Sequence, residues 1–260
     1  MPAAADVEGA AESLVPGKPV TALICAYPGI NARVGGERLA GSRTLTDQAT
    51  SMAHDLAFLP VGTDDVERFC TMVGGAMTNY LIRFGYSDGQ ALWVGSAEEV
   101  NSCVTTTNGT AASRSYVGRS ITRAYRAGVW RLEQPNDPCQ TSVGRRGQGE
   151  QMVPDGPIKV VVCRVDRNER LPARVEHGRE QARDLAGKLN AVNTEPGGNT
   201  CHEIDTGDRS RFRLIFSYED GPPAWVQIMS NCRPSMSNGL LQGDAGDVVR
   251  NRVVRLAPTP

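Results

Sequence analysis

Two parts of the chain show the same succession of hydrophobic patterns. Each opens with a Val-Pro pair, followed by an apolar, largely β-branched run that ends at a cysteine, at residues 20–25 and again at 158–163. Short apolar runs of this kind are typical of a strand that is buried on both faces. The Val-Pro pairs and the cysteines are displaced by the same number of residues, so we interpret the chain as an internal duplication.

A helical pattern follows each apolar run. Its apolar residues recur at the i, i+3, i+4, i+7 spacing that places one stripe of a helix against a core. The two stripes are Ala49, Met52, Ala53, Leu56 and Leu59, and Ala182, Leu185, Ala186, Leu189 and Val192. A second amphipathic segment closes each copy, with apolar positions at Val117, Ile121, Ala124 and Tyr125, and at Val249, Val253 and Leu256. We therefore expect two helices in each copy.

Between these helices, aromatic and aliphatic residues alternate with polar ones up to an Asp-Gly pair. The two segments are residues 80–89 and 212–221. Asp-Gly between alternating strands predicts a two-residue hairpin turn, because both turn positions need positive φ. That turn would place Phe84 opposite Trp93 and Phe216 opposite Trp225. Since aromatic cross-strand pairs stabilise sheets, we expect both tryptophans in the core.

These patterns predict an α+β fold of two tandem β-α-β-β-α repeats, in which antiparallel hairpin-containing sheets each pack against helices. Residues between the copies are rich in Pro, Gly and Arg, a composition typical of a linker. The expected organisation is a flexible N-terminal spacer at 1–13, a first repeat domain at 14–133, a linker at 134–151 and a second repeat domain at 152–260.

Charge and hydropathy argue against two classes of partner. The chain has 28 basic and 29 acidic residues and a net charge of −1, so whole-molecule electrostatics favour no nucleic acid. No apolar run approaches the roughly 18 residues of a membrane span, so no transmembrane segment is expected. Residues 1–15 lack the basic start and apolar centre of a signal peptide. An exported protein would therefore carry its signal or anchor outside this sequence.

Six of the seven cysteines occupy corresponding places in the two copies. Cys70 and Cys103 flank the first hairpin, as Cys201 and Cys232 flank the second, so we expect disulfides Cys70–Cys103 and Cys201–Cys232. Such bridges indicate an oxidising compartment. Cys25 and Cys163 lie within apolar strands, and three alternatives remain open for them. They are buried thiols, they bridge the two halves, or one of them pairs with Cys139 in the linker.

Other candidate chemistry is sparse. A zinc site is not expected, because there is no C-x-x-C pair and only three histidines are present. Neither a P-loop nor a calcium-binding Asp/Asn ladder occurs, so we expect no cofactor and no catalytic residues. Arg119, Arg123 and Arg126 line one side of a predicted helix and form a candidate anion-binding stripe. A hydrolase would require His54 or His202 to meet a nucleophile within hydrogen-bond reach.

Short motifs around the repeated elements resemble a loose group of proteins. The pieces are Cys25-Ala26-Tyr27, Phe84-Gly85-Tyr86-Ser87-Asp88-Gly89 with Cys103, Cys163-Arg164, and Phe216-Ser217-Tyr218-Glu219-Asp220-Gly221 with Cys232. They resemble uncharacterised secreted proteins and lipoproteins of actinobacteria. The scarcity of lysine, with only Lys18, Lys159 and Lys188, is a bias typical of high-GC genomes and suits such a source. The resemblance implies an extracellular or cell-envelope setting and brings no known activity.

Three functional hypotheses follow. The first is a non-enzymatic extracellular or cell-envelope binding or sensory protein, whose partner is an unknown protein or an envelope polymer. The second is a structural or interaction protein of the envelope, which self-association would distinguish from the first. The third is an unrecognised hydrolase.

Overall fold

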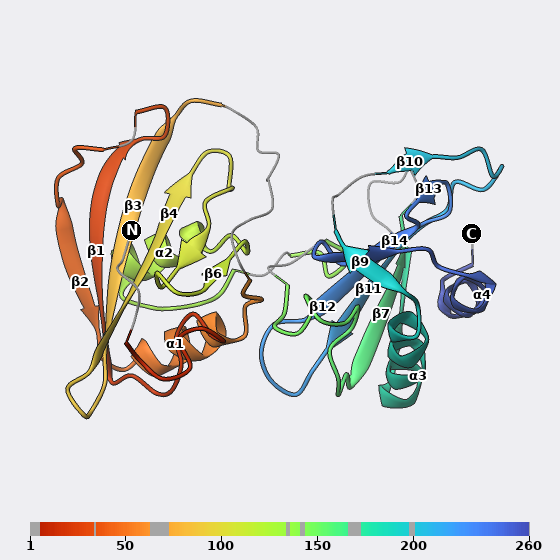
Figure 1. The fold of residues 1–260 in the computed structure, drawn as a ribbon, viewed down its shortest axis with the longest axis horizontal. Coiled ribbons are helices and arrows are strands. Elements are labelled where there is room, and N and C mark those ends of the chain that lie inside the picture. Colours follow the sequence, from red (N-terminus) through yellow and green to blue (C-terminus); the bar gives the residue numbers. More distant parts are fainter. Residues whose placement is uncertain are drawn as a thin grey trace. The chain divides into compact units, whose positions relative to one another are not determined.

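The computed structural model describes residues 6–33, 35–62, 73–133, 136–140, 144–165, 173–197 and 201–259. It is a mixed α+β structure with mostly antiparallel sheets, as the sequence predicts at the level of fold class. Contacts divide the chain into two compact units, Met1–Gln134 and Pro135–Pro260, which Figure 1 draws with their elements labelled. Each unit is described by itself below.

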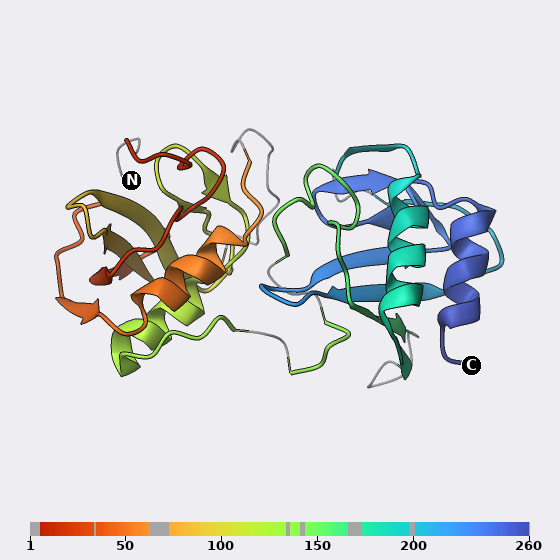
Figure 2. The ribbon, with the colours of Figure 1, turned by 90° about the horizontal axis from the view of Figure 1, so that it is seen from below.

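Unit 1 is built on one antiparallel sheet of strand order β2-β1-β3-β4-β5-β6. In chain order its elements are β1 (Thr21–Ile30), β2 (Gly41–Leu45), α1 (Ala49–Ala57), β3 (Ala76–Gly85), β4 (Ala91–Glu99), β5 (Thr106–Thr107), β6 (Ala112–Ser113) and α2 (Gly118–Ala127). Both helices lie on the same side of the strands (Figure 2). The helix-facing side chains of the sheet are fully buried at Ile24, Ile82 and Val94. The predicted stripe of α1, including Met52 and Leu56, is fully buried as well.

Unit 2 has a larger sheet of strand order β8-β7-β11-β12-β14-β15-β9. In chain order its elements are β7 (Lys159–Arg164), β8 (Ala173–His177), α3 (Arg179–Asn190), β9 (Thr194–Pro196), β10 (His202–Glu203), β11 (Arg211–Ser217), β12 (Ala224–Met229), β13 (Cys232–Arg233), β14 (Met236–Ser237), β15 (Leu241–Gly243) and α4 (Asp247–Leu256). Helices α3 and α4 lie side by side on one face of the sheet (Figure 2). Leu185 and Leu189 of α3 and Val253 of α4 pack there against Leu214 and Phe216.

The predicted element order β-α-β-β-α is incomplete in both units. An additional edge strand, β2 in unit 1 and β8 in unit 2, pairs with the first strand before the helix begins. Short strands also follow each central hairpin. The edge strands escaped the sequence pattern because they are short and their residues are mostly exposed or partly exposed. Strand β2 shows no alternation of apolar and polar positions, and the alternation of β8 is limited to Ala173 and Val175.

The predicted register of both hairpins is wrong by one residue. In unit 1 the amide of Tyr86 donates to the carbonyl of Gln90 (3.0 Å), which leaves a three-residue turn ending at Gly89 with φ of 88°. Turns of this length, with glycine in the left-handed region, are the next most common hairpin connection after the two-residue type. Phe84 therefore pairs with Leu92, whereas Trp93 pairs with Arg83.

A one-residue change of register moves side chains to the opposite face of a sheet. Trp93 is accordingly 40% exposed, on the side away from the helices, and not in the core. In unit 2 the same change pairs Phe216 with Ala224 and Ile215 with Trp225. Trp225 is partly buried, in a small cluster separate from the main core of that unit.

A buried asparagine ties the first described residues of unit 1 to its sheet. The Asn108 side-chain amide donates to the carbonyls of Ala10 (2.8 Å), Ser13 (3.0 Å) and Leu14 (3.3 Å). Its carbonyl oxygen accepts from the backbone amides of residues 110–111 (2.9 and 2.7 Å). Asn108 is fully buried, and so is Leu14. Within the described part of the predicted spacer 1–13, Ala10 and Ser13 are therefore packed against the unit.

Asn238 makes the same set of contacts in unit 2. Its amide donates to the carbonyls of Gln148 (2.8 Å), Gln151 (3.4 Å) and Met152 (3.1 Å). Its carbonyl oxygen accepts from the amides of residues 240–241 (2.9 and 2.7 Å). Gln148 and Met152 are buried, so the end of the predicted linker 134–151 is part of the packed unit. Glycine and arginine there reflect a tight turn structure.

Candidate functional site

The face of the unit-1 sheet turned away from its helices is the candidate site. Successive side chains of a strand point to opposite faces of the sheet, and this alternation determines which residues belong to the face. We call it the outer face of unit 1 and define it by Leu23, Cys25, Leu81, Arg83 and Trp93. Cys25 is paired with Leu81 in the sheet, and Leu23 and Trp93 are both paired with Arg83. Arg83 is exposed, while both leucines are partly exposed.

The corresponding face of the unit-2 sheet is covered by residues 136–140, which we call the strap. Cys139 of the strap forms a disulfide with Cys163 of β7, with 5.8 Å between the Cα atoms. Both cysteines are buried, together with Val161 and Ile215, and Trp225 packs against this cluster. Of the three alternatives that the sequence left open, the bond to Cys139 is thus the one found for Cys163.

Polar contacts also hold the strap. Arg213 donates through Nη1 to the carbonyl of Cys139 (2.7 Å) and Arg174 forms an ion pair with Asp137 (3.5 Å). Both arginines are directly paired with Cys163, one on each neighbouring strand. Burial lowers the pKa of Arg213, although its guanidinium stays charged at neutral pH. The strap is therefore fixed by one covalent bond and two cationic side chains.

The other predicted cysteine pairs have different outcomes. Cys201 and Cys232 form the expected disulfide, with a Cα separation of 5.1 Å. Cys103 is also disulfide-bonded, but its predicted partner Cys70 lies outside the described residues, so that pairing stays a prediction. Among the cysteines of the described ranges, Cys25 is the free thiol. It is 9% exposed, against 0% for Cys163.

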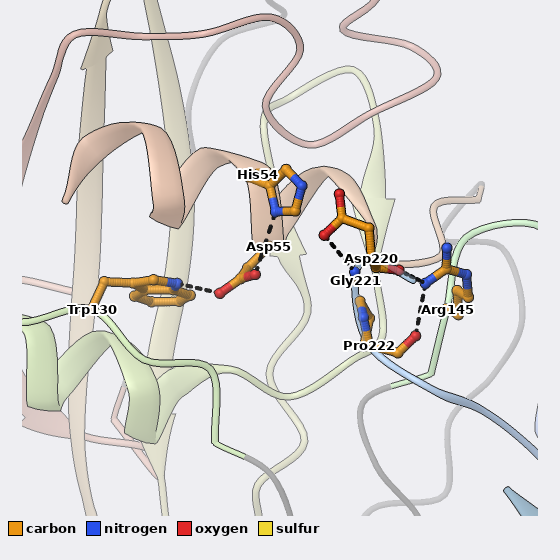
Figure 3. Close-up of polar contacts among 7 residues, drawn as sticks. All are labelled: His54, Asp55, Trp130, Arg145, Asp220, Gly221 and Pro222. Carbon is orange, nitrogen blue, oxygen red and sulfur yellow. Dashed lines mark hydrogen bonds and ion pairs between the residues drawn. The ribbon is translucent and has the colours of Figure 1, made fainter. Parts of the chain in front are cut away.

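His54, one of the two histidines on which the hydrolase hypothesis depended, lies on α1 beside an anchored carboxylate (Figure 3). Its Nδ1 is 3.6 Å from Asp55 Oδ1, and its ring packs edge-on against Phe58 with 4.9 Å between centroids. The other Asp55 oxygen accepts from Trp130 Nε1 (2.7 Å). That bond ties α1 to the segment after α2, which gives Asp55 a structural role. His202 is exposed and lies in β10.

Arg119, Arg123 and Arg126 are exposed on α2, as the candidate anion-binding stripe requires. Arg123 forms an ion pair with Glu133 (3.2 Å). The carbonyl of Arg126 accepts from Arg43 (3.2 Å), which fixes the end of the helix against β2. Anion binding by the stripe stays a prediction.

An arginine that the sequence analysis placed in the linker has a defined position in unit 2. Arg145 stacks on the ring of Tyr218, 3.8 Å from its centroid, and donates to the carbonyls of Asp220 (2.6 Å) and Pro222 (2.9 Å), as Figure 3 shows in part. The Tyr218 hydroxyl donates to the carbonyl of Pro154 (2.8 Å). Burial is the main cause that raises the pKa of Tyr218 and lowers that of Arg145. These contacts close the hairpin end of unit 2.

Within the described parts of the chain, no group of three or more His, Cys, Asp or Glu residues could hold a metal ion. No helix there is both long and apolar enough to cross a membrane.

The asparagines and the strap contacts were the features that sequence reasoning missed, and the recurrence of Asn-Gly after each hairpin was the available signal. Comparison of the chain with protein-family models, with curated proteins and with solved structures finds no match.

Proposed function

We propose that this chain is a non-enzymatic, disulfide-stabilised binding protein of the cell envelope or extracellular space, built from a duplicated domain. The observation that carries the proposal is the outer face of unit 1. An exposed arginine, a tryptophan exposed to 40% and two partly exposed leucines share one sheet surface there. Tryptophan and arginine are the residues most enriched among the energetic centres of protein interfaces.

The duplication is supported by contacts that recur between different residues. The Tyr86 hydroxyl donates to the carbonyl of Pro16 (2.7 Å), and Tyr218 donates in the same way to Pro154. Asn108 and Asn238 likewise hold corresponding segments through the same five hydrogen bonds. In each sheet the strand neighbours also follow the same order, from the edge strand through the first strand to the hairpin. We therefore regard the two units as copies that have diverged mainly on their outer faces.

The compartment is inferred from the cysteines. Disulfides Cys139–Cys163 and Cys201–Cys232 are compatible with an extracellular protein, because such bonds persist in oxidising environments. An envelope location also agrees with the resemblance to secreted and lipoprotein-type proteins of actinobacteria. An alkylation experiment on protein recovered from its producing cell tests this part. Because these cysteines are buried, the protein is denatured before alkylation. We expect Cys25 to be labelled without reduction, whereas labelling of Cys139 and Cys163 would contradict the proposal.

The binding function is tested with the full chain immobilised as bait and exposed to the envelope fraction of the producing cell. We expect a partner retained by the wild-type protein and by an Arg183→Glu control, which changes an exposed arginine on α3 of unit 2, and lost from Arg83→Glu. Equal retention by all three baits would exclude the outer face as the binding surface. Self-association of the chain through the same face would instead favour the structural alternative.

A further inference from the structure

Cys25 and Cys163 occupy corresponding places on the outer faces of two sheets, and one of them already holds an occupant. Cys163 is covalently bound to a turn, in which the Gln140 amide donates to the Asp137 carbonyl (2.9 Å), and this strap covers the apolar residues around it. Cys25 is a free thiol, itself 9% exposed, on a face where Leu23 and Leu81 are partly exposed and Trp93 is exposed. The strap thus shows within this protein what kind of ligand this sheet surface accepts.

We propose that the outer face of unit 1 binds a short, turn-forming, cysteine-containing segment of another protein and holds it through a mixed disulfide with Cys25. The inference rests on the proposed duplication and specifies the partner of the proposed binding face. The segment that the strap exemplifies is Asn-Asp-Pro-Cys-Gln, with a carboxylate two residues before its cysteine.

Charge complementarity defines the rest of the ligand. In unit 2 the carboxylate of Asp137 meets Arg174, and the Cys139 carbonyl meets Arg213. In unit 1 the residues paired with Cys25 are Leu81 and Ser42, so no arginine is directly opposite the thiol. The exposed cation of the outer face is Arg83, which lies two residue pairs further along the sheet and is paired with Leu23. A bound segment would therefore place an acidic side chain over Arg83 and an apolar side chain against Trp93.

The covalent step is thiol–disulfide exchange and needs no separate oxidant. The Cys25 thiolate attacks one sulfur of a disulfide that the partner already carries. A bond forms between Cys25 Sγ and that sulfur, while the partner's own S–S bond breaks. The leaving sulfur departs as a thiolate and takes up the proton that Cys25 lost. One disulfide is consumed and one is formed, so the electrons balance.

The test uses the full chain and a synthetic peptide Asn-Asp-Pro-Cys-Gln whose cysteine is linked to thionitrobenzoate. Release of the coloured thiol reports the exchange rate, and mass mapping identifies the labelled residue. The same mixed disulfide made with free cysteine serves as the probe that cannot dock. We expect the peptide to react about tenfold faster than the cysteine probe, because docking raises the local concentration of the reacting sulfur. Label should be found on Cys25 and disappear in Cys25→Ser.

Arg83→Glu is the diagnostic variant, because it reverses the charge of the face without touching the thiol. We expect it to slow the peptide about tenfold and to leave the cysteine probe unchanged. Arg83→Gln should be intermediate, and an unaltered thermal midpoint would show that both variants fold. Equal rates for the two probes, or a thiol that reacts only after denaturation, would overturn this inference. Neither result would contradict the proposed binding function, because the bait experiment above also detects non-covalent partners.

Discussion

The outer faces of the two sheets differ more than the cores behind them. In unit 2 the strap covers the face, and Val161, Cys163 and Ile215 are buried beneath it. In unit 1 the described residues leave Arg83 and Trp93 exposed on the corresponding surface. The cysteine at the corresponding place of the first strand is thus a free thiol in unit 1 and forms a structural disulfide in unit 2.

This difference distinguishes the residues that the fold requires from the residues that are available for binding. Asparagine ties, tyrosine hydrogen bonds and helix stripes occur in both units, so they belong to the framework. Among the described residues, a covering segment is seen on the outer face of unit 2 alone, so we assign that cover to the features in which the two units differ. Corresponding substitutions that lower the stability equally in the two units should therefore identify framework residues. Corresponding substitutions with unequal effects should identify residues of the outer faces.

The largest effect is expected from the asparagines. Asn108→Ala and Asn238→Ala should each lower the free energy of unfolding by about 4 kcal/mol, because each removes several buried hydrogen bonds worth about 1 kcal/mol and leaves carbonyls and amides unpaired. Urea unfolding measures both losses. Asn108→Asp and Asn238→Asp keep the acceptor and should still lose most of the stability. A loss in one unit only would break the correspondence between the two frameworks.

Removal of the strap disulfide comes next. The double variant Cys139→Ala with Cys163→Ala should cost about 3 kcal/mol, because the bond closes a loop with a sequence separation of 24. Cys25→Ala should cost less than about 1 kcal/mol, since it removes one small side chain and no cross-link. Thermal unfolding of the three proteins checks the comparison. Similar losses for Cys25→Ala and the double variant would mean that Cys25 is as structural as Cys163.

Sequence patterns were reliable wherever one face of an element is buried along its length. The stripes of α1 and α3 were predicted because apolar residues recur at helical spacing, and all four buried positions of α3 match. Hairpin register was not predictable from Asp-Gly alone. The pair suits both a two-residue and a three-residue turn, and the difference of one residue reversed the faces of Trp93 and Trp225.

Features that depend on distant contacts were out of reach of sequence reasoning. Asn108 meets residues nearly 100 positions away, and an Asn-Gly pair by itself signals only a local turn. The bond between Cys139 and Cys163 could be stated only as one of several alternatives, because spacing does not determine cysteine pairing. The outer face of unit 1 was missed for a related reason, since the wrong register placed Trp93 in the core.

Substitution of the tryptophans should have an intermediate effect on stability, and the two variants compare the outer faces of the two units. Trp225→Ala should cost about 2 kcal/mol, because the ring packs on the strap cluster and lies over Gly239, where an added Cβ would be 3.0 Å from it. Trp93→Ala should cost less than about 1 kcal/mol, because that ring is 40% exposed. Chemical denaturation of both variants provides the values. A larger loss for Trp93→Ala would show that the outer face of unit 1 is a packed structural surface.

The smallest effect is expected from the tyrosines, and it appears only at alkaline pH. Burial, with a smaller contribution from Asp88, raises the pKa of Tyr86 to about 12, and burial raises that of Tyr218 as well. The folded state therefore keeps phenol protons that the unfolded chain releases above its pKa of about 10. Stability is unaffected below pH 10 and falls as the pH rises toward 12. Because Tyr86 is half exposed, we expect it to contribute only about 1 kcal/mol of this loss.

Tyr86→Phe and Tyr218→Phe test this assignment against each other. Each variant should lose about 1 kcal/mol at pH 7, where the hydrogen bond to Pro16 or Pro154 is missing. Each should then show a shallower decline in stability between pH 10 and 11 than the wild-type protein, because one buried phenol no longer titrates. The flattening should be greater for Tyr218→Phe, since burial affects that hydroxyl more. If the urea midpoints of both variants changed with pH as those of the wild-type protein do, the alkaline loss of stability would arise elsewhere in the chain.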